Sequence, residues 1–200
     1  ERDDGGQVKW LFFQERCLHC RDASCMRVCP TEAIKRYGVA VVIDQAWCIG
    51  CGYCRAACPF DIPRLGEEPD KGTARKCNYC IDRLSNGNIT PACTKTCPAE
   101  ALKYGGRDEI IALGKKRVEE LKAKGFQEAN LYGDNLPGVR DLTVMYVLTE
   151  PPAVYGLPEN PRVATQVAPF QWLSGLVTAG VVAALPFWLL FRRREAIQES

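Results

Sequence analysis

The segment CIGCGYCRAACPF, residues 48–60, decides the fold of this chain because it places four cysteines at the spacing C-x₂-C-x₂-C-x₃-C and follows the last one with a proline. Three thiolates on so tight a loop can bind three corners of one iron-sulfur cubane. Gly50 and Gly52 allow the backbone to approach the inorganic sulfides closely. The fourth cysteine, Cys58, lies too far round the following turn to join the other three. We therefore expect it to serve a second site, which requires another group of cysteines.

Two further groups occur among the twelve cysteines of the chain. They read CLHCRDASCMRVCP, residues 17–30, and CNYC, residues 77–80, followed by CTKTCP, residues 93–98. Cysteines at every third position have diverging side chains, which disfavours a disulfide framework. Structural zinc remains an alternative for the third group, because two closely spaced cysteine pairs can form a tetrahedral site. The spacing of the middle group is typical of bacterial two-cluster ferredoxins.

In the two-cluster arrangement, the last cysteine of each motif binds the cluster of the other motif. The first two groups are then one folding unit with exchanged ligands. The predicted ligand sets are Cys17, Cys20, Cys25 and Cys58 for one [4Fe-4S] cluster, and Cys48, Cys51, Cys54 and Cys29 for a second. Four residues separate Cys20 from Cys25, which alters the loop but leaves three ligands and a remote fourth.

The third group has no partner motif in this sequence. Cys77, Cys80 and Cys93 have the character of three ligands to a third cluster, and Cys97 that of a ligand donated to a neighbour. Two alternatives follow: Cys97 closes its own cluster, or it binds a cluster held by an upstream motif that the sequence lacks. The chain begins with Glu1 and runs at once into VKWLFF, a plausible strand, so we expect an N-terminal truncation and a fourth cluster.

The remaining soluble part is predicted to be α+β, with a duplicated ferredoxin-like cluster domain over residues 1–107. Residues 29–44 predict a helix start, a turn at Gly38 and a β-branched strand, and residues 97–106 repeat the opening of that segment. Residues 108–150 are expected to cover the cluster domain with a helix over 108–124 and a strand over 142–150. The apolar face of that helix is predicted to contain Ile110, Ile111, Leu113, Val118 and Leu121.

A proline-rich linker is expected over residues 151–167, and an uncharged segment follows over 168–191. Its 24 residues are long enough to cross a hydrocarbon core of roughly 30 Å. The arginines of the basic tail, residues 192–200, predict that this tail is cytoplasmic and that the cluster domain lies on the periplasmic side of the inner membrane. Gly175, Ala179 and Ala183 share one stripe of the helix, which favours packing against another membrane helix.

The net charge and the single residues near the cysteines say less about function than the cysteine spacing does. The net charge of +2 gives no reason to expect a nucleic-acid partner. His19, the only histidine, lies between two predicted ligands and is expected to donate a hydrogen bond to sulfur or to the backbone. Lys76 adjoins Cys77 and could tune a cluster potential, although a solvated surface lysine is the commoner case.

A family resemblance covers nearly the whole chain. The three cysteine groups and the final apolar span closely resemble those of the iron-sulfur beta subunits of membrane-bound respiratory formate dehydrogenases, which belong to the four-cluster electron-transfer subunits of molybdopterin oxidoreductases. The matching segments are CIGCGYCRAACPFDIPR (48–64), RKCNYCIDRLSNGNITPACTKTCPAEALKYG (75–105), KRVEELKAKGF (116–126), VMYVL (144–148) and YGLPENPRV (155–163).

The resemblance implies a subunit without substrate chemistry of its own. Such a subunit passes electrons from a molybdenum or tungsten catalytic subunit to a membrane cytochrome b with haem, which reduces quinone. Family members carry four cysteine groups, the first paired with the last, whereas three are present here. The alternatives are the same module in a hydrogenase or a sulfur-compound reductase, an autonomous enzyme, and a zinc-stabilised membrane adaptor.

Overall fold

The structure is a computed structural model of the chain, and it describes residues 2–4, 7–66, 72–87, 90–136, 139–163 and 168–198. The chain divides into two compact units, Glu1–Val163 and Ala164–Ser200. The elements of the first unit, in chain order, are β1 (Arg2–Asp4), β2 (Gln7–Lys9), α1 (Ser24–Arg27), β3 (Ile34–Tyr37), β4 (Ala40–Ile43), α2 (Tyr53–Ala56), β5 (Arg64–Leu65), β6 (Ala74–Arg75), α3 (Ile81–Ser85), α4 (Ala92–Thr96), α5 (Arg107–Ala123), β7 (Asn130–Tyr132), β8 (Tyr146–Leu148) and the 3₁₀ turn η1 (Pro152–Tyr155).

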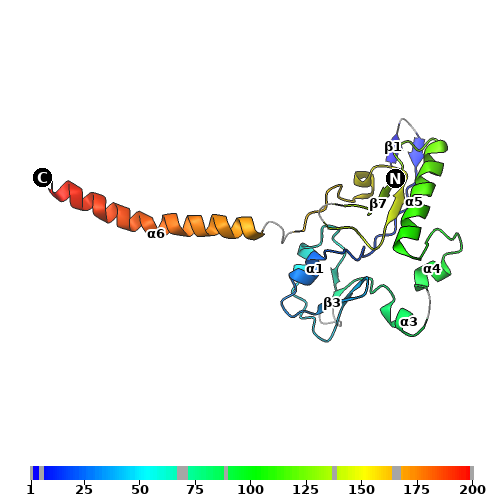
Figure 1. The fold of residues 1–200 in the computed structure, drawn as a ribbon, viewed down its shortest axis with the longest axis horizontal. Coiled ribbons are helices and arrows are strands. Elements are labelled where there is room, and N and C mark those ends of the chain that lie inside the picture. The colour runs from blue at the N-terminus through cyan, green and yellow to red at the C-terminus, as the bar shows by residue number, and fades with distance from the viewer. Residues whose placement is uncertain are drawn as a thin grey trace. The chain divides into compact units, whose positions relative to one another are not determined.

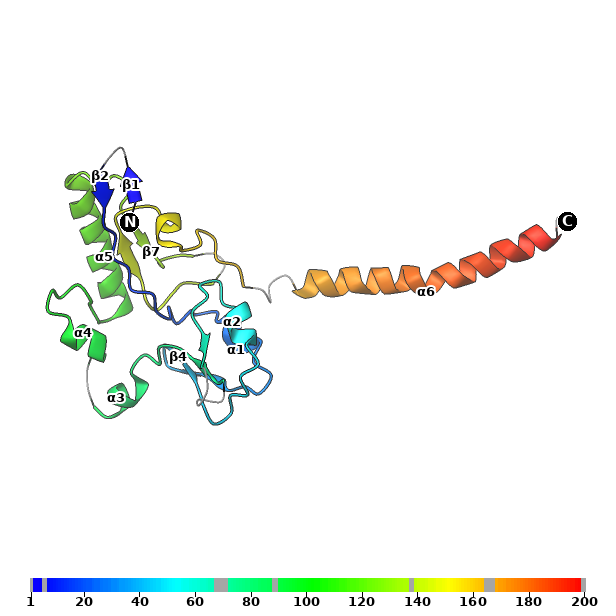
Figure 2. The same cartoon turned by 180° about the vertical axis from the view of Figure 1, so that it is seen from behind.

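The first unit is a mixture of short helices and two-stranded antiparallel hairpins, which confirms the α+β prediction. The described strands pair as β1–β2, β3–β4, β5–β6 and β7–β8. Helices α1 and α2 contact each other and each carries a cysteine, Cys25 and Cys54 respectively. Figure 2 shows these two helices side by side, and α5 beside β7 and the β1–β2 hairpin. The first two cysteine motifs are therefore packed together as related halves.

Three Cys-Pro turns repeat the same backbone geometry. Each starts at a cysteine, Cys29, Cys58 or Cys97, whose carbonyl oxygen accepts the N–H of the third residue after it, at 3.1 to 3.3 Å. That third residue has a positive φ although it is not glycine: Glu32 at 52°, Asp61 at 48° and Glu100 at 49°. The repeat of residues 29–34 at 97–102 is thus real, but the expected helix start is wrong, because residues 29–33 form this turn and lead directly into the β3–β4 hairpin.

Two hydrophobic clusters support the cysteine loops. One surrounds the fully buried Val41 of β4 and contains Ile34, Ala23 and Ala74, with several cysteine side chains packed against it. The other is built around Leu142 and Tyr132 and contains Leu18. The backbone after β7 also pairs with the first cysteine loop, since Asp22 N–H donates to Val139 O at 3.0 Å and Thr143 N–H donates to Leu18 O at 3.1 Å. The segment beyond residue 108 therefore fixes the first loop directly.

Helix α5 confirms the predicted helix and its predicted apolar face except at Leu113, since Ile110, Ile111 and Val118 are half-buried and Leu121 is buried. It ends just before Gly125, as expected, and that glycine has a φ of 99°. Leu113 was assigned to the buried face, yet it is 44 % exposed. The contact with β7 is made instead at Gly114, where an added Cβ would lie 2.8 Å from Leu131 Cδ1. The helix approaches the strand so closely because a glycine occupies this position.

Three other expectations about elements need adjustment. The strand predicted over residues 8–13 is present only as β2, and the strand predicted over 142–150 is reduced to β8. Residues 151–163 are not a free linker, because Leu157 and Val163 are buried in the cluster around Leu142. Residues 164–167, the rest of the predicted linker, lie outside the described residues.

The described part of the second unit is one helix, α6 (Ala168–Gln198), with Pro186 inside it (Figure 1). Its apolar segment Trp172–Leu189 has a mean hydropathy of 1.7 and is long enough to cross a membrane. None of that segment is buried within the structure. This agrees with the predicted apolar C-terminal helix, which continues into the residues predicted as a tail.

Candidate metal centres

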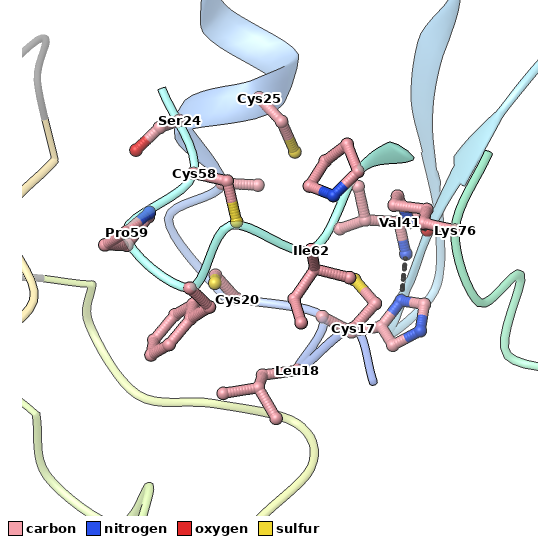
Figure 3. A pocket seen from close by; sticks show the side chains of 14 residues that line it. Cys17, Leu18, Cys20, Ser24, Cys25, Val41, Cys58, Pro59, Ile62 and Lys76 are labelled. Carbon is pink, nitrogen blue, oxygen red and sulfur yellow. Dashed lines mark hydrogen bonds between the residues drawn. The ribbon is translucent and has the colours of Figure 1, made fainter. Parts of the chain in front are cut away.

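The first predicted ligand set comes together at one pocket. Cys17, Cys20, Cys25 and Cys58 all line it, although Cys58 lies more than thirty positions beyond the others in the sequence. Figure 3 shows how three segments supply them: the extended first loop, helix α1 and the second Cys-Pro turn. Most of the other lining residues are apolar, among them Leu18 and Phe60, and the polar ones are His19, Ser24 and Lys76. The exchange of the last cysteine between motifs therefore has a geometric basis here.

Burial makes these thiols difficult to ionise alone. It raises the pKa of Cys25 to about 12, with the neighbouring Cys17 and Cys58 adding to the shift despite an opposing effect of Lys76. The pKa of Cys20 is also raised, first by burial and then by the adjacent thiols. Several thiolates close together in an apolar pocket need a compensating cation, and metal coordination deprotonates a thiol outright. The donor set therefore fits an iron-sulfur cluster.

Two buried polar atoms beside the pocket support this fit. His19 Nε2 and Ser24 Oγ have no hydrogen-bond partner among the described residues, and both residues line the pocket. His19 Nδ1 accepts the N–H of Val41 at 3.0 Å. Burial, together with nearby Lys76 and Arg16, lowers the pKa of His19 to about 3. The neutral ring therefore carries its proton on Nε2 and can donate to a sulfur acceptor. The expected donor role fits Nε2, whereas the contact with the backbone is one in which His19 accepts.

The second predicted set lies partly together around the Val41 cluster. Cys29, Cys48 and Cys54 belong to that cluster, whereas Cys51 is exposed. Cys48 Sγ accepts the N–H of Ala74 at 3.3 Å. Burial slightly raises the pKa of Cys29, but hydrogen bonds from the Thr31 side chain and from backbone N–H groups that follow outweigh it, so the pKa is lowered. Residue 29 is thus prepared to act as a thiolate, as its predicted ligand role requires.

In the third group the structure connects two of the four cysteines. Arg16 Nη1 donates to Cys93 Sγ at 3.4 Å, and Arg16 Nη2 donates to Cys77 Sγ at 3.9 Å. The described contacts do not join Cys80 or Cys97 to this pair. Cys97 lies in the third Cys-Pro turn, where the N–H groups of Leu102 and Ala101 lower the pKa of its thiol.

One basic residue near the sites, Lys76, was misjudged from the sequence alone, and another, Arg16, was missed. Lys76 is not a solvated surface lysine, because its Nζ donates to Val41 O and, at 3.2 Å, to Cys77 O. Arg16 was not identified at all. It precedes Cys17 directly, but its sulfur partners lie 77 and 61 residues away in the sequence, so no local pattern could have shown the contact.

The described residues contain no group of three His, Cys, Asp or Glu side chains placed to hold a single metal ion. At the first site, four thiols instead line a pocket.

Comparison with known proteins agrees with this chemistry. Residues 8–107 match the family of 4Fe-4S dicluster domains. The chain is 41% identical over 189 residues to the iron-sulfur subunit of the nitrate-inducible formate dehydrogenase of Escherichia coli, which covers 92% of this chain and 63% of that protein. It is 40% identical to the formate dehydrogenase iron-sulfur subunit of Haemophilus influenzae, over 92% of this chain and 58% of that protein.

A third relative is similar over a shorter region. The electron transfer subunit of thiosulfate reductase from Salmonella typhi is 48% identical over 110 residues, which is 54% of this chain and 56% of that protein. The chain thus spans somewhat less than two thirds of the length of the curated relatives that it matches.

Proposed function

The chain belongs to the 4Fe-4S dicluster family, and we propose that within this family it is the iron-sulfur subunit of a formate dehydrogenase complex. Its cofactors are [4Fe-4S] clusters, which sets aside the zinc-stabilised adaptor. The observation that carries the proposal is the meeting of Cys17, Cys20, Cys25 and Cys58 at one apolar pocket, in a chain 41% identical to such a subunit. The chain itself then transfers electrons and does not act on formate.

A [4Fe-4S] cluster supplies a one-electron couple whose potential depends on charge, hydrogen bonds to sulfur and solvent exposure. The described residues of this chain affect two of these, the hydrogen bonds to sulfur and the solvent exposure. Leu18, Phe60, Pro59 and Pro63 give the first site an apolar lining, which limits its contact with water. Ala74 N–H and Tyr79 N–H donate to the sulfurs of Cys48 and Cys77, at 3.3 and 3.4 Å. These donors stabilise thiolate ligands and remain fixed while the electron moves, so little reorganisation is required.

The ligand assignment within the proposal follows the exchange rule. Cys17, Cys20 and Cys25 share a cluster with Cys58, while Cys48, Cys51 and Cys54 share one with Cys29. Cys77, Cys80 and Cys93 hold a third cluster. The cluster that Cys97 binds is not yet assigned. The backbone setting of Cys97 matches that of Cys29 and Cys58, the two cysteines that are donated to the other motif in this assignment.

Iron and acid-labile sulfide per chain, measured on the anaerobically purified complex and corrected for haem, decide the role of Cys97. About 16 iron atoms per protein would mean four cubanes, with Cys97 binding a cluster held by a further motif. About 12 would mean that Cys97 closes the cluster of Cys77, Cys80 and Cys93. Zinc without sulfide would overturn the assignment altogether.

The proposed partners are a molybdopterin catalytic subunit containing molybdenum or tungsten and a cytochrome b subunit that contains haem and reduces quinone. Helix α6 supports the membrane part of this proposal, because its apolar segment Trp172–Leu189 is exposed and long enough to span the lipid. The three arginines after residue 191 favour a cytoplasmic C-terminus. Protease added from the periplasmic side should therefore digest the first unit in intact inner-membrane vesicles of right-side-out orientation, and protection there would reverse the proposed orientation.

Thiosulfate reductase is the second candidate complex, because the matching region of its electron transfer subunit is 48% identical. That similarity covers 54% of this chain, whereas the formate dehydrogenase relatives cover 92%. The longer match favours formate. The test is the purified complex under anaerobic conditions: formate should bleach the cluster absorbance within turnover time, and thiosulfate should not reoxidise it. Reoxidation by thiosulfate without reduction by formate would assign the chain to the other complex.

A further inference from the structure

Arg16 places a permanent positive charge against the third cysteine group. Its two terminal nitrogens donate to Cys93 Sγ and Cys77 Sγ, at 3.4 and 3.9 Å. Its Nε is buried and has no partner among the described residues. Within that same part of the chain Arg16 forms no ion pair with a carboxylate. Among the described residues, the charge of Arg16 is therefore directed at thiol sulfur and not at a carboxylate.

Arg16 is also held at the junction between the first and the third cysteine groups. It immediately precedes Cys17, and the loops of the two groups contact each other through His19 and Tyr79, whose ring centroids are 4.9 Å apart. On the other side, Tyr146 of β8 donates its hydroxyl hydrogen to Gln14 O at 2.8 Å. This hydrogen bond fixes the backbone two residues before Arg16. The position of the guanidinium is thus set by the fold and is not that of a free surface side chain.

We propose that Arg16 raises the reduction potential of the cluster held by Cys77, Cys80 and Cys93. Reduction adds one electron to this site and no proton, so the negative charge on the ligands and sulfides increases by one. Arg16 stays protonated in both states, and its attraction to the site is stronger in the reduced state. Partial burial weakens the screening of that attraction by water. The inference rests on the proposed function, because it requires a cluster at these cysteines.

The test is a redox titration of the anaerobically purified complex, with dithionite as reductant, ferricyanide as oxidant and the reduced clusters followed by electron paramagnetic resonance. Arg16→Gln should lower the midpoint potential of one cluster and leave the others in place. That cluster is identified as the one whose signal a Cys80→Ser change alters. Arg117→Gln is the matched control, because it removes the same charge from an exposed ion pair on α5 and should shift no potential.

Arg16→Lys separates charge from structure. Lysine keeps the charge but cannot donate to two sulfurs from a planar group, so the potential should fall by less than in Arg16→Gln. If Arg16→Gln loses the third cluster, Arg16→Met takes its place, because methionine also removes the charge but retains an unbranched side chain, and an unchanged potential in Arg16→Met overturns the inference. Equal shifts in Arg16→Gln and Arg117→Gln also overturn it. Absence of iron and sulfide from the unmodified complex would instead reject the proposed function, so the two failures are distinguishable.

Discussion

Cysteines 29, 58 and 97 differ from the other nine in one respect: each starts a Cys-Pro turn that directs backbone N–H groups toward its sulfur. For Cys97, the N–H groups of Leu102 and Ala101 are the main cause of a lowered pKa. For Cys58 burial is the larger effect, so the pKa is raised, although the N–H groups of Ile62 and Phe60 oppose it. The proline removes a competing donor and fixes φ at the second position of the turn. In the proposed ligand assignment, the repeated turn presents a single thiolate to a cluster outside its own motif.

The exchange of Cys58 can be tested by counting iron in single and double variants. Cys58→Ser should remove one cluster, about four iron atoms per chain. The double variant Cys17→Ser and Cys58→Ser should lose no more, because both residues serve the same site. The double variant Cys48→Ser and Cys58→Ser should instead lose both clusters, about eight iron atoms per chain, because these residues serve different sites. If the Cys17/Cys58 double variant lost about eight iron atoms and the Cys48/Cys58 double variant only about four, Cys58 would belong to the cluster of its own motif.

The hydroxyl of Tyr146 links stability to alkaline pH. Burial raises the pKa of Tyr146 from 10.0 to about 12. Because the folded-state pKa is the higher one, the unfolded chain releases its proton first, and the contribution to stability is complete below pH 10 and disappears as pH rises toward 12. Tyr146→Phe should therefore show a shallower fall of the unfolding temperature across this interval. Tyr37→Phe, at an exposed tyrosine, serves as the control and should keep the slope of the unmodified protein.

At the scale of elements, the β7–β8 hairpin and the loop within it are what hold the first cysteine loop. Arg107 of α5 donates to Leu142 O at 2.8 Å, and Thr143 Oγ1 donates to His19 O at 2.8 Å. Helix α5, the loop before β8 and the CLHC segment are thus joined in series. A substitution that displaces the loop before β8 should therefore alter the geometry of the first cluster site, even when no cysteine is replaced.

Gly133, just after β7, is constrained both by its backbone conformation and by its neighbours. It has a φ of 106°, and an added Cβ would lie 3.1 Å from Met145 Cγ and 3.3 Å from Leu142 Cβ. We expect Gly133→Ala to destabilise the protein by about 2 kcal/mol through backbone strain and crowding. Gly125→Ala is a suitable comparison, because its φ is also positive but no atom lies within 4 Å of the new Cβ. Urea unfolding should show the smaller loss at residue 125, and equal losses would mean that the contacts with Met145 and Leu142 do not matter.

What the sequence could predict was set by local spacing. The grouping of Cys17, Cys20 and Cys25 with Cys58 followed from the ligand rule, and the structure brings all four to one pocket. The helix from residue 108 and its end at Gly125 followed from periodicity and a helix stop signal. These features depend on residues close together in the chain or on a chemical motif with fixed geometry.

What could not be predicted depends on contacts between distant segments. Leu113 is exposed because the close approach of α5 to Leu131 occurs at Gly114, which no amphipathic pattern reveals. Leu157 and Val163 lie in a segment with the composition of a proline-rich linker, yet both side chains pack into the core around Leu142. Arg16 has no motif of its own, and its two sulfur partners are set by the tertiary fold alone.

At the scale of the whole molecule, the two units have opposite solvent requirements. The first unit has its own buried clusters, including Val41 and Leu142, each with no exposed surface. The second unit buries none of the apolar segment Trp172–Leu189. The side chains of Leu176, Val177 and Phe187, for example, are each at least 66 % exposed. So large an apolar surface is stable only when lipid or another apolar helix covers it. The apolar helix and the cysteine groups therefore lie in separate units of the chain.

Removing α6 should release the chain from the membrane without removing a cluster ligand. A chain that ends at Val163 keeps all twelve cysteines and both buried clusters. Expressed without partner subunits, it should move to the soluble fraction after an alkaline carbonate wash and keep its iron. The full chain should stay with the membrane, because an uninterrupted apolar span of this length favours the bilayer strongly.

A control variant separates membrane insertion from mere loss of a long helix. Pro186→Ala preserves the apolar span and should remain resistant to carbonate. Val181→Glu places a charge near the middle of the same segment, at a cost of roughly 3 kcal/mol for a membrane span. Its share in the carbonate-soluble fraction should rise. If the chain ending at Val163 stayed with the membrane, the first unit would have an attachment of its own. If Val181→Glu had no effect, the helix would lie against a protein or a lipid surface and not across the bilayer.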